Sequence, residues 1–184
     1  GVIPGMDLKV GEMLSAQQKN TVSAMTEQTD IMMARSISLS EEITKELSQY
    51  LTANGKAFSD LNDNPQLIMD LEATLYSSLR SALDVKYCSG VFVILNATVN
   101  TETEYADTSR MGIYLRLSDL KAVNTSKQHV VFFRGNADIA RAEQIQLHNR
   151  WNLEFDTSAL PGYEQIMKFD GNRLVESCLW TDRL

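Results

Sequence analysis

Two apolar runs in the middle of the chain constrain its fold more than any other feature. The first, GVFVILNATV over residues 90–99, is too short for a membrane span and rich in β-branched and aromatic residues, so it predicts a buried strand. The second, SRMGIYLRL over residues 109–117, predicts another strand, whose core-facing positions are Met111, Ile113, Leu115 and Leu117. The middle of the chain is therefore expected to form a sheet with at least one buried face.

The opposite face of the second predicted strand would carry Arg110, Gly112, Tyr114 and Arg116. An arginine and a tyrosine that project together can grip a carboxylate, the guanidinium by two parallel hydrogen bonds and the phenol by one. The alternative is that both side chains simply face solvent on an open sheet. Strand patterning alone leaves both interpretations open.

Composition limits the classes of partner. The chain has 184 residues, enough for one domain or for a small domain with a long helical extension. Its formal net charge of -7 argues against binding to a phosphate backbone, so we expect no nucleic acid partner. No run reaches the roughly 18 apolar residues that a membrane helix needs. The two cysteines, Cys88 and Cys178, allow one disulfide bridge or two buried thiols.

Long helices are predicted before the first strand. Residues 6–51 lack proline, are rich in helix-forming residues and carry a thin apolar stripe that includes Ile43 and Leu47. A helix-start signal around Ser40 suggests a bend or break near residues 36–40 as the alternative to one continuous helix. Asn54-Gly55 ends this segment, and Pro65 opens a second helix that runs to about Leu83.

The rest of the chain predicts more strands. HVVFFRG, beginning at His129, forms a third strand, and Asn136 or Asp138 caps a short helix that leads into the segment HNRWNLEFD. A turn at residues 170–172 would join two hairpin strands, residues 165–169 and 173–180. The prediction is an α+β fold, with a long N-terminal stalk helix over residues 1–55 and a module over 56–184. In that module a second helix packs on an antiparallel sheet of about five strands.

Nothing in the sequence indicates catalysis or a cofactor. The histidines, His129 and His148, have no carboxylate at a metal-ligand spacing, so no metal site is expected. Nucleophile-elbow and phosphate-binding glycine motifs are absent. The paired acids, such as Glu102 and Glu104, are more simply solvated than catalytic. The chain is therefore expected not to be an enzyme.

Aromatic residues and arginines concentrate after residue 86. They are Tyr87, Arg110, Tyr114, Arg116, Phe133, Arg134, Trp151, Tyr163 and Trp180. Aromatic walls with one or two fixed cations suit a pocket for a small anionic or zwitterionic molecule. The same residues could equally fill a core or a dimer face.

The order of elements and the motifs FVILNATVN, SRMGIYLRL, FFRG and IQLHNRWNLEFD resemble the Cache family, PAS-like sensor domains found outside the bacterial membrane. The likeness is greatest to the sensor portions of membrane-anchored AraC-type regulators and related histidine kinases. It covers most of the chain from about Leu8. The chain ends at WTDRL, before the second, membrane-proximal half of double Cache proteins, so either that half lies outside this sequence or the protein has a single module.

The resemblance implies an extracytoplasmic sensor that is anchored by membrane segments outside this sequence and transmits binding through the N-terminal helix to a cytoplasmic kinase or transcription regulator. The ligand would be a small molecule, in one version carboxylate-bearing, and the long helix could form a homodimer. The expected ligand-binding residues are Arg110, Tyr114, Phe133, Trp151, Asp156 and Trp180. The pattern of the amino-acid-binding members is incomplete, because the chain has Arg110 and Tyr114 but no tryptophan two residues after Arg110, which puts amino acid recognition in doubt. The alternative function is a dimerising structural or interaction module without a small-molecule ligand.

Overall fold

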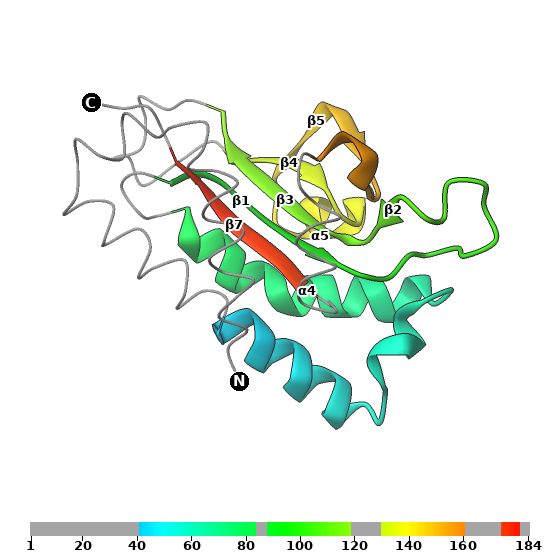
Figure 1. The fold of residues 1–184 in the computed structure, drawn as a ribbon. Coiled ribbons are helices and arrows are strands. Elements are labelled where there is room, and N and C mark those ends of the chain that lie inside the picture. The colour runs from blue at the N-terminus through cyan, green and yellow to red at the C-terminus, as the bar shows by residue number, and fades with distance from the viewer. Residues whose placement is uncertain (1–40, 84–87, 119–129, 161–173, 181–184) are drawn as a thin grey trace, which may run out of the picture.

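The computed structural model describes residues 41–83, 88–118, 130–160 and 174–180. In these parts the chain has an α+β fold, in which helices pack against a mixed five-stranded sheet and a separate two-stranded sheet lies beside it (Figure 1). The general prediction of an α+β fold is therefore confirmed. Residues 1–40, which make up most of the expected stalk helix, lie outside the described parts, and so does the expected strand over residues 165–169.

The two helices before the first strand form where the sequence predicts them. Residues 41–53 are helical, and Ile43 and Leu47 of the predicted stripe are buried. Gly55 follows with φ 63°, the left-handed conformation that glycine adopts at helix ends without steric cost. The next helix, α4 (Pro65–Ala82), starts at Pro65, and its N-cap Asn64 accepts a hydrogen bond from the backbone N–H of Leu67 at 3.1 Å.

The main sheet has the strand order β5-β4-β3-β1-β7. Its strands are β1 (Cys88–Leu95), β3 (Gly112–Leu117), β4 (Val130–Arg134), β5 (Gln146–Asn152) and β7 (Leu174–Trp180). Neighbouring strands are antiparallel except β4 and β5, which are parallel. The prediction of an all-antiparallel sheet is therefore wrong. The short helix α5 (Ala137–Ala142) lies between β4 and β5 in sequence and provides the crossover that a parallel pair needs.

The predicted strand over residues 109–117 is divided in two. Ser109–Arg110 forms β2, which pairs with β6 (Phe155–Asp156) in the small sheet, and β3 begins only at Gly112. Met111 is the point of division. Its carbonyl still accepts from the N–H of Leu95 at the end of β1 at 3.0 Å, whereas its own N–H donates past β1 to the carbonyl of Ala97 at 2.8 Å. The expectation that Arg110 and Tyr114 project from one strand is therefore wrong.

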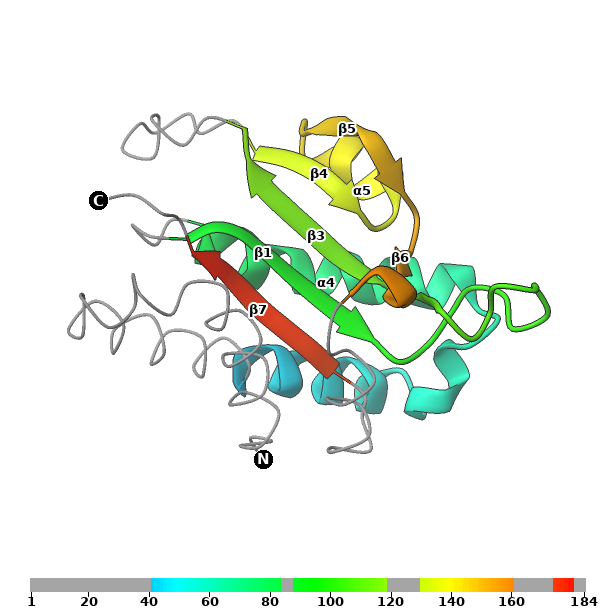
Figure 2. The same cartoon turned by 45° about the horizontal axis from the view of Figure 1, so that its top comes forward.

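The core lies between α4 and the sheet. In the β1–β3 register Val91 is opposite Leu115 and Val93 is opposite Ile113, and all four side chains are at most 1% exposed. α4 contacts both strands and lies behind the sheet in Figure 2. Its inward positions match the prediction from spacing, since Leu67, Ile68, Leu71, Leu75 and Leu79 are all buried. The opposite face of the sheet, which points away from α4, carries different side chains, among them Phe92 and Tyr114.

Candidate functional site

Five aromatic rings gather on the sheet face that points away from α4, and we call them the aromatic face. They are Phe92, Tyr114, Phe133, His148 and Phe155. The rings of Tyr114 and Phe133 stack with centroids 5.0 Å apart, and those of Phe133 and His148 with centroids 4.1 Å apart. Phe155 stacks on Tyr114 at 6.3 Å, within the range of favourable aromatic pairs.

Local register explains why these rings meet. Phe92 is directly opposite Tyr114 in the antiparallel β1–β3 pair, so both side chains project to the same face. The β3–β4 register shifts between Tyr114 and Leu115, and Phe133 is the residue of β4 without a partner there. Phe155 pairs with Arg110 in the small sheet, and its ring approaches Gly112 closely because glycine has no side chain. A Cβ atom at Gly112 would lie only 2.8 Å from the Phe155 ring.

Two arginines act on the phenol of Tyr114. Burial raises the pKa of Tyr114, while a hydrogen bond from Arg116 and the positive charges of Arg116 and Arg134 lower it. Arg116 is exposed, whereas Arg134 is half-buried and donates to the carbonyls of Phe133 at 2.7 Å and Arg150 at 2.9 Å. Desolvation lowers the pKa of the Arg134 guanidinium. The aromatic face therefore combines stacked rings with fixed positive charge, an arrangement suited to a planar or carboxylate-bearing anion.

Arg110, expected to bind ligand, stabilises a loop. Its Nε donates to Oδ1 of Asn96 at 2.8 Å, and one terminal nitrogen donates to the carbonyls of Ala106 at 2.6 Å and Ser109 at 2.7 Å. Asn96 and Ala106 belong to the connection between β1 and β2, and Ser109 is the first residue of β2. The structure therefore separates Arg110 from the aromatic face, although its pairing partner Phe155 belongs to that face.

The other expected ligand-binding residues are dispersed. Trp151 of β5 is half-buried against the core, and its indole N–H donates to the carbonyl of Gly135 at 3.0 Å. Asp156 is exposed and caps the short 3-10 helix η3 (Thr157–Ala159) by accepting from the backbone N–H of Ser158 at 3.0 Å. Trp180 ends β7, and its side chain, like those of Cys88 and Cys178, lies outside the described parts. Of the six expected residues, the structure brings together Tyr114 and Phe133.

The sequence interpretation missed Glu72, a carboxyl buried beneath the sheet. The residue is 1% exposed, and its two carboxyl oxygens accept the backbone N–H groups of Gly112 at 3.2 Å and Asn136 at 3.0 Å. Burial raises its pKa to about 8, although both hydrogen bonds oppose the shift, and the negative charge of Glu154 adds to it. An acid within the apolar stripe, four residues after Ile68 and three before Leu75, was the available signal.

A second acid, Glu154, holds the loop next to Arg110. One of its oxygens accepts from the hydroxyls of Thr98 at 2.6 Å and Ser109 at 3.1 Å, and from the backbone N–H of Val99 at 3.3 Å. Its other oxygen is buried without a hydrogen-bond partner among the described residues. These contacts hold the start of β2 against residues 98 and 99 of the connection that follows β1, a structural role.

The described residues contain no group of three or more His, Cys, Asp or Glu side chains that could hold a metal ion. Within the same residues, no helix combines the length and the apolar character needed to cross a membrane. Comparison of the chain with protein families, curated proteins and solved structures gave no match.

Proposed function

We propose that the chain is the extracytoplasmic ligand-sensing domain of a bacterial membrane-anchored signalling protein, of the Cache or PAS-like type. A small carboxylate-bearing molecule would bind at the aromatic face, and the helix of residues 41–53 would carry the signal towards the membrane. The observation that carries this proposal is the column of stacked rings from Phe155 through Tyr114 and Phe133 to His148, with Arg116 and Arg134 beside it.

Three features support a binding role over a purely structural one. First, Tyr114, Phe133 and His148 remain half-buried, unlike the fully buried Phe132 on the α4 side of the same sheet. Second, the guanidinium of Arg116 is exposed beside a phenol whose environment is largely desolvated, so an anion there would gain charge-assisted hydrogen bonds. Third, α4 covers only the opposite face. A ligand on the aromatic face therefore need not displace the helical layer.

The alternative, a dimerising module that works through its long helix, needs an apolar stripe available to a second copy. Over residues 41–53 this stripe is occupied within the monomer, because Ile43, Leu47 and Leu51 are at most 8% exposed. Contact with the rest of the domain is also polar, since the hydroxyl of Ser78 on α4 donates to Glu42 at 3.1 Å and to Glu46. The helix of residues 41–53 therefore packs against its own domain, which argues against the dimerising alternative.

A thermal-shift screen of the chain against carboxylates, amino acids, purines and sugars tests the proposal. A ligand at 100 times its Kd stabilises the folded state by about 2.7 kcal/mol, which corresponds to a rise in Tm of roughly 5 to 10 °C. The rise should shrink in Arg116→Ala and in Tyr114→Phe, which keeps the ring but removes the hydroxyl.

The matched control is Arg141→Ala, because Arg141 lies on α5 with its side chain 79% exposed and pairs with the nearby Asp138. This variant should bind as the wild type does. If no compound stabilises the wild type, or if Arg116→Ala and Tyr114→Phe respond as fully as Arg141→Ala, the proposed site is wrong.

A further inference from the structure

Glu72 is a buried acid that connects three elements of the fold. It projects from the middle of α4 and accepts hydrogen bonds from two backbone N–H groups that belong to different elements. Gly112 is the first residue of β3, and Asn136 is the N-cap of α5. We propose that the Glu72 carboxyl is a pH-operated latch that holds the starts of β3 and α5 against α4.

The geometry makes the two protonation states unequal. An ionised carboxylate offers two good acceptor oxygens, and each N–H group then has a charge-assisted bond. A protonated carboxyl keeps one good acceptor and gains a hydroxyl that needs an acceptor of its own. Because the bond to Gly112 is 3.2 Å and that to Asn136 is 3.0 Å, we expect protonation to weaken the bond to Gly112 first.

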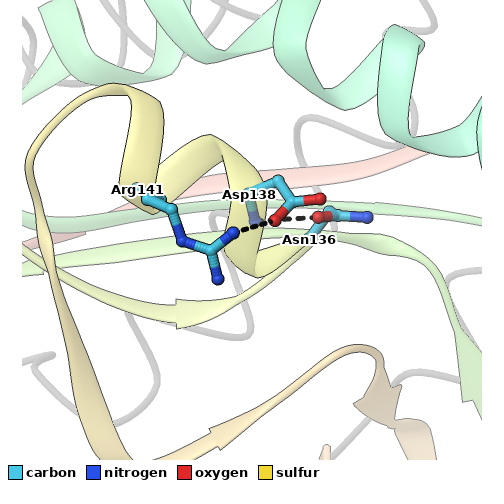
Figure 3. Close-up of polar contacts among 3 residues, drawn as sticks. All are labelled: Asn136, Asp138 and Arg141. Carbon is cyan, nitrogen blue, oxygen red and sulfur yellow. Dashed lines mark hydrogen bonds and ion pairs between the residues drawn. The ribbon is translucent and has the colours of Figure 1, made fainter.

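The surroundings of the Glu72 carboxyl determine the pH range in which it titrates. Burial raises the pKa of Glu72 to about 8 against the stabilising effect of its two backbone bonds, so both states occur near neutral pH. The charged side chain that acts on Glu72 is Glu154, from the connection between β5 and β6. On α5, Asp138 and Arg141 are exposed and pair with each other at 2.8 Å (Figure 3).

The remaining neighbours of Glu72 add no ionised partner among the described residues. β3 carries Tyr114 and Arg116 on the face opposite to α4, since they alternate with the buried Ile113 and Leu115. From the helix of residues 41–53, Glu42 and Glu46 bond to Ser78, six residues further along α4. The latch therefore depends on one acid and two backbone donors.

The position of the latch gives it a consequence beyond local packing. Tyr114 lies two residues after Gly112, where β3 begins, and Phe133 lies three residues before Asn136, which follows the end of β4. α4 in turn contacts the helix of residues 41–53 through Ser78. A change in the charge of Glu72 therefore acts on the aromatic face and on the helical layer together. The latch itself requires no ligand, so it stands whether or not the proposed sensing function holds.

Nuclear magnetic resonance of the isotope-labelled whole chain between pH 6 and 9.5 tests the latch. We expect one glutamate carboxyl carbon to titrate with a midpoint near pH 8, and the amide protons of Gly112 and Asn136 to shift with the same midpoint. In Glu72→Gln both amides should lose this response. Glu102→Gln, which changes an exposed acid in the loop before β2, should leave it intact.

Two results would overturn the proposal. One is that the Gly112 and Asn136 amides show no common titration in the wild type, or keep it in Glu72→Gln. The other, which needs no variant and so decides the matter if Glu72→Gln does not fold, is that every glutamate carboxyl carbon titrates below pH 6.

Discussion

Gly112→Ala should destabilise the protein by more than its single added methyl group suggests. A Cβ atom at Gly112 would lie 2.0 Å from the backbone oxygen of Val93 and 2.8 Å from a ring carbon of Phe155. The oxygen belongs to β1, which is hydrogen-bonded to strands on both sides, so it cannot move away alone. β3 would have to separate from β1 at its first residue.

The magnitude follows from two contributions. Overpacking of a filled site costs about 1 to 3 kcal/mol. Displacing Gly112 also breaks its bond to the buried Glu72, and a buried polar group without its partner costs about 1 to 3 kcal/mol. We therefore expect a loss of about 2 to 6 kcal/mol, a large part of the 5–15 kcal/mol typical of a folded domain. The near-ultraviolet circular dichroism should also change, because Phe155 is displaced from Tyr114.

Urea unfolding of Gly112→Ala and Gly55→Ala, followed by tryptophan fluorescence and far-ultraviolet circular dichroism, measures the difference. Gly55 has φ 63° but nothing within 4 Å of its added Cβ, so alanine there should cost only about 1 kcal/mol of backbone strain. If the two variants lose equal stability, the close approach of β1 and Phe155 to Gly112 is not what sets the cost.

Three further predictions concern stability. Because the folded-state pKa of Glu72 is about 8 against an ordinary value of 4.5, the folded state binds more protons between these values, and stability should fall as pH rises. Between pH 6 and 9 the loss is about 3 kcal/mol in the wild type relative to Glu72→Gln, and parallel stability–pH curves would contradict it. Asn64→Ala removes the N-cap of α4 and should cost about 1 kcal/mol in urea unfolding, whereas a cost near zero would show that the bond to Leu67 is not needed. Trp151→Phe keeps an aromatic ring but removes the donor to Gly135, so thermal unfolding should show a loss of about 1 kcal/mol, and an unchanged Tm would refute that bond.

The features that the sequence predicts correctly are those set by neighbours along the chain. Pro65 and Asn64 determine the start of α4 through the fixed φ of proline and the side-chain acceptor of asparagine. In the same way, the Asn136 side chain accepts from the N–H of Asp138 and begins α5 (Figure 3). Each interaction spans at most three residues, so spacing is enough to find it.

The features that the sequence does not predict depend on contacts between segments that are far apart along the chain. Glu72 and its two donors are separated by 40 and 64 residues, and nothing near Glu72 in sequence indicates them. Likewise Arg110 leaves the strand of Tyr114 because Phe155 pairs with it from a segment 45 residues later. The parallel β4–β5 pair was missed because α5 was recognised as a helix but not as a crossover.

The candidate site divides in the same way. Tyr114 and Phe133 could be named from sequence because the two strands that carry them were recognised, and adjacent strands bring their side chains together. His148 is not among the residues expected to bind ligand, because its stacking on Phe133 requires the parallel pairing of β5 with β4. Knowing the strands is therefore insufficient without their order.

The aromatic face and the Glu72 latch share β3, and the second latch residue, Asn136, follows the end of β4, so their coupling is measurable. If a ligand at Tyr114 and Phe133 favours one arrangement of β3 and β4 against α4, it must also change the proton affinity of Glu72, because linkage between two sites is reciprocal. The ratio of its Kd values well below and well above the pKa of Glu72 should then equal the factor by which binding shifts the Glu72 acid dissociation constant. Calorimetric titration at the two pH values gives the first quantity and the carboxyl carbon shift of the complex gives the second. A ligand whose Kd depends on pH in the wild type and equally in Glu72→Gln would show that the latch and the aromatic face act independently.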